Sequence, residues 1–152
     1  MANRKDNGPV LFAYDGSEHA KAAIRQAARQ LGTGRRAIVL TVWNPLATMP
    51  FGTTAGLSTV GLGESIQWEA RKVAGEGAEL ARSNGFDAKA VAEMGEPVWQ
   101  RIVDSAREHN AAIVAMGTHG HTGIGLMLLG SVAAATARHT DRPVLIAHAP
   151  ES

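Results

Sequence analysis

Five short segments of mainly apolar residues alternate along the chain with longer segments in which apolar residues recur at helical spacing. The short segments are Val10 to Tyr14, Ala37 to Trp43, Asp87 to Met94, Ala111 to Met116 and Pro143 to Ala147. All but the third are apolar almost throughout, which is typical of strands buried on both faces of a parallel sheet. The third mixes apolar and polar residues, so it is predicted to be an edge strand.

The clearest helix is predicted to follow the first strand. Asp15-Gly16-Ser17 supplies a turn and an N-cap in Ser17, and apolar residues recur at helical spacing from Ala20 to Leu31. Gly32 is placed to end this helix. A second helix is predicted over 65–84, with Gly85 as its stop.

Two further helices are predicted in the second half of the chain. Gly95-Glu96-Pro97 opens the third, with the proline in its first turn. The residues expected on its buried face are Trp99, Ile102, Val103 and Ala106. The fourth helix is short and begins at Ser131, after a loop from Gly117 to Gly130 that holds five glycines.

This alternation predicts an α/β fold, a single doubly wound (Rossmann-like) domain with helices on both faces of a parallel sheet. The chain has 152 residues, of which 45% are hydrophobic, so it can bury one substantial core but not two. We expect the domain to span 9–149 and residues 1–8 to form a flexible N-terminus. The Gly- and Thr-rich stretch 44–63 predicts a long loop, which is either a functional lid or disordered.

Charge and composition narrow the choice of partners. The 15 basic and 14 acidic residues are scattered and give a net charge of +1, which disfavours nucleic acid or an anionic membrane as partner. The chain has no cysteine, which excludes disulfides, thiolate metal sites and cysteine nucleophiles. No apolar run approaches the roughly 20 residues of a membrane span, and we expect a cytoplasmic protein.

The loops that follow the first, second and fourth strands are the candidate site, because ligands of open parallel sheets bind beyond the carboxyl ends of the strands. A helix that begins at Gly130-Ser131-Val132 offers free backbone N–H groups and a positive dipole end, which suit a phosphate. Gly130 would let the backbone approach that phosphate closely. Gly117 and Gly120 would let the chain leave the fourth strand without a side chain that blocks a sugar.

Other binding and catalytic motifs are incomplete in this sequence and are therefore disfavoured. The stretch from Gly125 to Ser131 has the glycine spacing of a P-loop but lacks its lysine, and Gly61-Leu62-Gly63 lacks the rest of a dinucleotide fingerprint. His119 and His121 lack further fixed ligands for zinc. Ser131, His139 and Asp141 have no nucleophile elbow, which disfavours a hydrolytic triad. The residues expected instead at the surface or as caps are His19, His109, His139 and His148.

One motif resembles that of a known family. Gly117-Thr118-His119-Gly120, then nine residues, then Gly130-Ser131-Val132, is similar to the ATP-binding motif of the universal stress proteins. The resemblance extends from Val10 to Ala147 and includes the Asp-Gly-Ser turn and Gly95-Glu96-Pro97. It implies five parallel strands in the order 3-2-1-4-5 and a homodimer joined through the last strand, 143–148. It also implies bound ATP, AMP or cyclic AMP, with Mg²⁺ held through the nucleotide.

The resemblance also implies roles for individual residues. Asp15 would hold the ribose or the ion, and the backbone of Val42 would hold adenine. Ribose and phosphates would be lined by Gly117 and Gly120, and the phosphates would be cradled by Gly130, Ser131 and Val132. Ala13, Tyr14 and Met116 would border the nucleotide. His119 fills a position that is often arginine in the family, so phosphate affinity would depend on pH.

Three functions remain open from the sequence. The first is a regulatory module that binds an adenine nucleotide without turning it over, because the motif supplies no lysine to neutralise developing phosphate charge. The second is a slow ATPase or a nucleotidyl-transfer enzyme. The third is a dimeric interaction protein without a nucleotide, which the intact glycine motif disfavours. The role of Asp15 is open as well, since Asp before Gly-Ser often only forms a turn.

Overall fold

Five parallel strands form one sheet in the order β3-β2-β1-β4-β5 in the computed structural model, which describes residues 7–44, 59–119 and 130–149. The strands are β1 (Val10–Ala13), β2 (Arg36–Trp43), β3 (Asp87–Met94), β4 (Ile113–Gly117) and β5 (Val144–Ala147). The helices are α1 (Glu18–Leu31), α2 (Thr59–Ser83), α3 (Val98–Glu108) and α4 (Ser131–His139). The predicted fold class, strand order and helix count are therefore confirmed.

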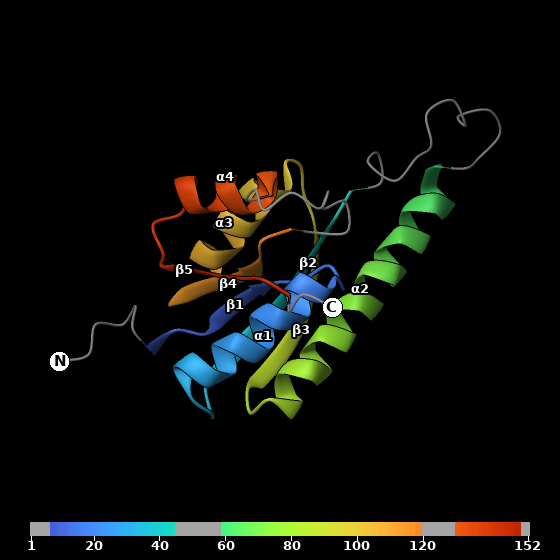
Figure 1. Cartoon of the computed structure of the whole chain (residues 1–152). Coiled ribbons are helices and arrows are strands. Elements are labelled where there is room, and N and C mark those ends of the chain that lie inside the picture. The colour runs from blue at the N-terminus through green and yellow to red at the C-terminus, as the bar shows by residue number, and fades with distance from the viewer. Residues whose placement is uncertain (1–6, 45–58, 120–129, 150–152) are drawn as a thin grey trace.

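The sheet separates two hydrophobic cores, with α1 and α2 on one face and α3 and α4 on the other (Figure 1). Successive residues of β1 alternate between them, because neighbouring side chains of a strand point to opposite faces. Phe12 packs in the first core with Ile24 of α1, whereas Leu11 packs in the second with Ile102 of α3. Burial on both faces explains why the central strands are apolar throughout.

Helix α1 begins and ends as its sequence predicts. The Ser17 hydroxyl accepts a hydrogen bond from the Ala20 amide over 3.2 Å, which satisfies one of the free N–H groups of the first turn. Gly32 caps the other end with a φ of 79°, a conformation that glycine adopts without steric cost.

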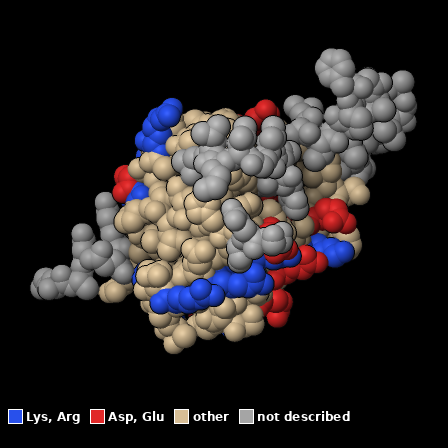
Figure 2. Space-filling view, viewed as in Figure 1, with Lys and Arg blue, Asp and Glu red and all other residues tan. Residues whose placement is uncertain are grey.

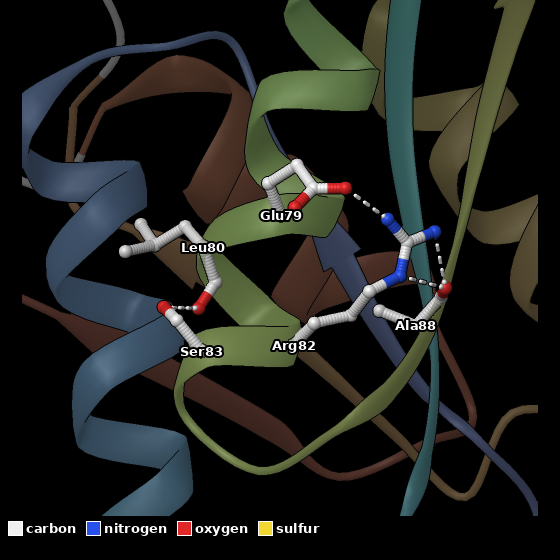
Figure 3. Close-up of polar contacts among 5 residues, drawn as sticks. All are labelled: Glu79, Leu80, Arg82, Ser83 and Ala88. Carbon is white, nitrogen blue, oxygen red and sulfur yellow. Dashed lines mark hydrogen bonds and ion pairs between the residues drawn. The ribbon is translucent and has the colours of Figure 1, made fainter.

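Helix α2 is longer than predicted. It begins at Thr59 and ends at Ser83, so part of the predicted loop 44–63 is helical, and the remainder, 45–58, lies outside the described residues. The glycines at 61 and 63 suggested a loop, but glycine only weakens a helix, by about 1 kcal/mol each relative to alanine. The turn at the other end is tied to the sheet by Arg82, whose guanidinium donates to the Ala88 carbonyl (2.9 and 3.1 Å) and pairs with Glu79 at 2.6 Å (Figure 3).

Helix α3 differs from its prediction in two details. Pro97 is the N-cap residue before the helix and not part of its first turn. Trp99 is only partly buried, and its ring stacks on His139 of α4 with 4.2 Å between ring centroids, while the predicted Ile102, Val103 and Ala106 are buried. The aromatic ring therefore joins α3 to α4 near the surface.

The two edge strands of the sheet are β3, as its mixed pattern predicts, and β5. At the start of the described chain Gly8 is buried, and its carbonyl accepts a hydrogen bond from Arg35. The face shown in Figure 2 carries basic and acidic side chains together, with uncharged surface between them. Among the helices of the described residues, none has the length and apolar character needed to cross a membrane.

Candidate functional site

The carboxyl ends of β1 and β4 lie side by side in the middle of the sheet, at the point where the strand order reverses. The chain leaves β1 into α1 on one face, and after β4 it continues to α4 on the other face. Diverging connections of this kind leave the strand ends open to a ligand. The sequence places the candidate residues at this end of the strands.

Four of the predicted residues share the face of the sheet that α3 and α4 cover. Ala13, Val42 and Met116 come from the ends of three adjacent strands, and Val132 comes from the first turn of α4. Met116 is buried, whereas Ala13 and Val42 are partly exposed. Together they form an apolar floor at the strand ends, against which a flat apolar ring could pack.

Tyr14 lies differently from its neighbours. Its side chain is buried in the core on the opposite face, against Gly77 of α2, so only its backbone lies at the strand end. Its N–H donates to the Leu40 carbonyl and its carbonyl accepts from the Thr41 hydroxyl, both over 2.8 Å. Burial raises the pKa of the Tyr14 phenol above its usual value. The Tyr14 side chain therefore packs on the face of the sheet opposite the candidate site, behind the end of β1.

Asp15 has at least the turn-forming role that its context predicts. Its Oδ1 atom accepts a hydrogen bond from the Ser17 amide over 3.0 Å, and Ser17 in turn caps α1. The carboxylate is partly exposed beside the end of β1. This geometry compensates one of the free amides at the start of α1 and keeps a negative charge near its positive dipole end.

A backbone hydrogen bond joins the two halves of the glycine motif. The Gly130 amide donates to the Thr118 carbonyl over 2.7 Å, which brings the start of α4 against the residue that follows β4. The expectation that this amide is free for a phosphate is therefore wrong. Ser131, which is exposed, and Val132 follow as the first helical residues, whose amides have no partner inside the helix.

Two glycines of the motif, Gly117 and Gly130, are required by the packing of the protein itself. A Cβ atom on Gly130 would lie 2.7 Å from the Thr118 carbonyl oxygen. A Cβ atom on Gly117 would lie 2.5 Å from the Cβ of His19 and 2.6 Å from its carbonyl carbon, so the close packing of β4 against α1 by itself requires a glycine here. Gly120 lies outside the described residues.

His19 is the residue that sequence reasoning missed, since it was expected at the surface or as a cap. It is partly buried, and its ring lies 5.5 Å from that of His119, centroid to centroid. Its Nδ1 atom is 3.2 Å from the Thr118 hydroxyl and 2.9 Å from the Ala149 amide nitrogen. Its position in the first turn after the Asp-Gly-Ser loop was the available signal, because that turn starts at the strand ends.

A hydrolytic triad finds no support in this geometry, and of the two histidines considered for zinc, His121 lies outside the described residues. Ser131 and His139 stand at opposite ends of α4, about 12 Å apart along a nine-residue helix, so they cannot share a hydrolytic triad. Within the part of the chain that the structure describes, no three His, Cys, Asp or Glu side chains gather as metal ligands.

These features define a doubly wound α/β protein whose candidate site lies where strand order reverses. The model of the universal stress protein family matches residues 7–148, nearly the whole chain, and the protein belongs to that family. Among curated relatives, a universal stress protein of Thermus aquaticus, named for the QAH/OAS sulfhydrylase 3' region, is 30% identical over 145 residues. The universal stress protein YxiE of Bacillus subtilis is 27% identical over 147 residues. Each alignment covers 90% of this chain and 96% of the relative.

Solved structures show the same fold. Hypothetical protein MJ0577 superposes with a TM-score of 0.77 at 24% identity, over 97% of this chain and 99% of that chain. A universal stress protein in complex with cAMP gives a TM-score of 0.64 at 24% identity, over 95% and 99% of the two chains. The Archaeoglobus fulgidus universal stress protein in complex with dAMP gives 0.55 at 21% identity, over 93% and 98%.

Proposed function

We propose that this protein binds an adenine nucleotide at the carboxyl ends of β1, β2 and β4 and acts as a dimeric, nucleotide-dependent regulatory module in the cytoplasm. The observation that carries the proposal is the 2.7 Å hydrogen bond between Gly130 and Thr118. It joins the two glycine-containing halves of the motif and sets the N-terminus of α4 beside the end of β4. An anion there would meet unpaired helical amides and a positive dipole end.

The remaining candidate residues extend from this anion site along the strand ends. The apolar floor of Ala13, Val42 and Met116 suits an adenine ring, and the Ser131 hydroxyl can donate to a phosphate oxygen. Asp15 stands at the end of β1 for a ribose hydroxyl or for the Mg²⁺ that accompanies ATP. Structures of family members with cAMP and dAMP support an adenine nucleotide as the ligand.

Binding without turnover fits the groups that the motif supplies. Phosphoryl transfer depends on positioned cations that neutralise charge on the transferred group. The predicted site residues offer backbone amides, a hydroxyl, a carboxylate and one imidazole, with no lysine or arginine among them. Steady-state assays of phosphate and pyrophosphate release separate this regulatory function from a slow ATPase or a nucleotidyl-transfer enzyme.

Thermal unfolding with nucleotides tests the proposal. A ligand that binds only the folded state at a hundredfold excess over its Kd adds about 2.7 kcal/mol. For a domain of this size that corresponds to a rise in Tm of roughly 5 to 10 °C. We expect this rise with ATP and Mg²⁺ and a smaller one with GTP. Absence of any shift with ATP, AMP or cAMP at millimolar concentration would refute the proposal.

Native mass spectrometry of gently purified protein supplies an independent measurement. It reports the mass of any copurified nucleotide and the number of subunits together. We expect a dimer that carries an adenine nucleotide.

A further inference from the structure

The imidazole of His19 uses one of its two nitrogens within the protein. Nδ1 lies 2.9 Å from the amide nitrogen of Ala149, just after β5, and 3.2 Å from the Thr118 hydroxyl oxygen. Nε2 has no hydrogen-bond partner in the part of the chain that the structure describes, and it is not buried. The side chain is therefore anchored through one nitrogen, and the other is available to a ligand.

The Ala149 amide decides which nitrogen of His19 carries the proton. A backbone N–H can only donate, so Nδ1 of His19 accepts from it with its lone pair. Neutral imidazole has one N–H and one acceptor nitrogen, so the proton of neutral His19 is on Nε2. The proton position follows from the amide alone, whichever way the Thr118 hydroxyl is turned. His19 thus presents a hydrogen-bond donor without carrying a positive charge.

This donor stands beside the glycine motif. The carbonyl of Thr118 accepts from the Gly130 amide over 2.7 Å, so Thr118 lies between the imidazole of His19 and the start of α4. The ring of His119 lies 5.5 Å from that of His19, centroid to centroid. Charged phosphate oxygens accept hydrogen bonds from N–H groups. An N–H group at this place therefore complements the free amides of α4.

We propose that His19 is a further nucleotide-binding residue: its Nε2–H group donates a hydrogen bond to a phosphate oxygen, while the Ala149 amide holds the imidazole in the tautomer that can donate. The ligand is that of the proposed function, on which this role rests. His19 belongs to the first turn of α1, outside the glycine motif, so the phosphates are held from α1 as well as from α4. Neutral imidazole is sufficient, so the contact persists at about pH 8, where ordinary histidines carry no charge.

Two variants at position 19 separate the roles of the two ring nitrogens. His19→Asn sets an amide oxygen near the place of Nδ1, where it can accept from Ala149, but it has no donor that reaches the place of Nε2. His19→Gln sets an amide group near the place of Nε2, which keeps a donor there, but it gives up the acceptor for Ala149. In calorimetric titrations at about pH 8 we expect ATP affinity to fall roughly ten- to hundredfold in His19→Asn, the effect of one hydrogen bond to a charged group. His19→Gln should stay within about threefold of wild type.

A purely structural role for His19 predicts the opposite order of affinities. Loss of the bond to Ala149 would then damage the site, and His19→Gln would bind ATP more weakly than His19→Asn. We expect that order only in the Tm of the nucleotide-free variants, with His19→Gln the less stable. His139→Asn, at the far end of α4, is the control that should leave ATP affinity unchanged. Wild-type ATP affinity in His19→Asn, or weaker binding by folded His19→Gln than by His19→Asn, would overturn the proposal.

Spectra of the wild-type protein keep the test decisive if a variant fails to fold. Long-range ¹H–¹⁵N correlation spectra at about pH 8 should show His19, identified by its absence from the spectrum of a position-19 variant, as the Nε2–H form. Saturating ATP should slow the exchange of this proton with water, whereas adenosine, which has no phosphate, should not. A His19 ring that is mainly Nδ1–H, unchanged exchange with ATP bound, or an equal effect of adenosine would overturn the proposal. Absence of ATP binding by the wild type would instead overturn the proposed function on which this role rests.

Discussion

Gly77 of α2 lies directly against the ring of Tyr14, so that a Cβ atom on the glycine would come within 2.7 Å of a ring carbon. Gly75, two residues earlier in the same helix, has open space where its Cβ would be. A larger residue therefore fits at position 75, whereas at position 77 it would collide with Tyr14.

We predict that Gly75→Ala raises the free energy of unfolding by about 0.5–1 kcal/mol, because alanine is the better helix former. Gly77→Ala should lower it by about 1–3 kcal/mol, because the new methyl group overpacks the core. Urea unfolding of both variants beside wild type measures the difference. Equal effects of the two substitutions would contradict the packing of α2 on Tyr14.

The glycine at the start of α4 gives a prediction about the ligand. Gly130→Val should abolish measurable ATP binding, because any Cβ there meets the Thr118 carbonyl oxygen at 2.7 Å and forces the two halves of the motif apart. Ser131→Ala should be milder, with a loss of about 1.5–3 kcal/mol for one hydrogen bond to a charged group. Calorimetric titration decides both, with circular dichroism to check the fold. Full ATP affinity in a folded Gly130→Val variant would show that phosphates bind elsewhere.

Alkaline pH should weaken the fold through Tyr14. Burial raises the pKa of this phenol in the folded protein, whereas the unfolded chain loses the proton near the usual value of about 10. The stability that this difference contributes is complete below about pH 10 and is lost as pH rises towards the folded pKa. Unfolding free energies at about pH 9 and 11 should therefore fall less in Tyr14→Phe than in wild type. Parallel losses in the two proteins would exclude Tyr14 as the source.

The open edge at β5 predicts how two copies pair. Val114 donates to the Pro143 carbonyl and Thr118 donates to the Ala147 carbonyl, so the backbone groups of the intervening Val144 and Ile146 face away from β4. Ile146→Pro removes one outward-facing amide and keeps every hydrogen bond to β4. Edge strands tolerate proline at such a position. We expect a folded monomer from this variant and a dimer from wild type.

Sedimentation velocity at micromolar concentration measures the oligomeric state of wild type and of Ile146→Pro. Leu145→Pro is the contrasting variant, because its amide faces β4, and it should unfold the sheet edge. A folded Ile146→Pro dimer would place the interface elsewhere, and a monomeric wild type would refute the dimer.

The sequence predicts the fold well because each buried strand is apolar on both faces and each turn carries its own chemistry, as at Ser17 and Gly32. It predicts less where long-range packing decides. The start of α2 was missed because glycines reduce helix propensity without forbidding a helix. His19 was missed because its contacts are with Thr118 and Ala149, which are 99 and 130 residues away along the chain. The motif glycines were found by their spacing, but their contacts with Thr118 and with α1 appear only in three dimensions.

The unequal edges of the sheet would limit the size of an assembly formed through β5. The β3 edge carries Asp87, Lys89 and Glu93, charges of the kind that discourage a further strand. The β5 edge carries no charge from Val144 to Ala147, and the guanidinium of the preceding Arg142 is turned inward onto the Ala111 carbonyl. Pairing of two copies through β5 would consume both uncharged edges and leave only charged ones outside. In such a dimer, growth would stop at a closed pair, because the contact that joins the two copies would leave no uncharged edge for a third.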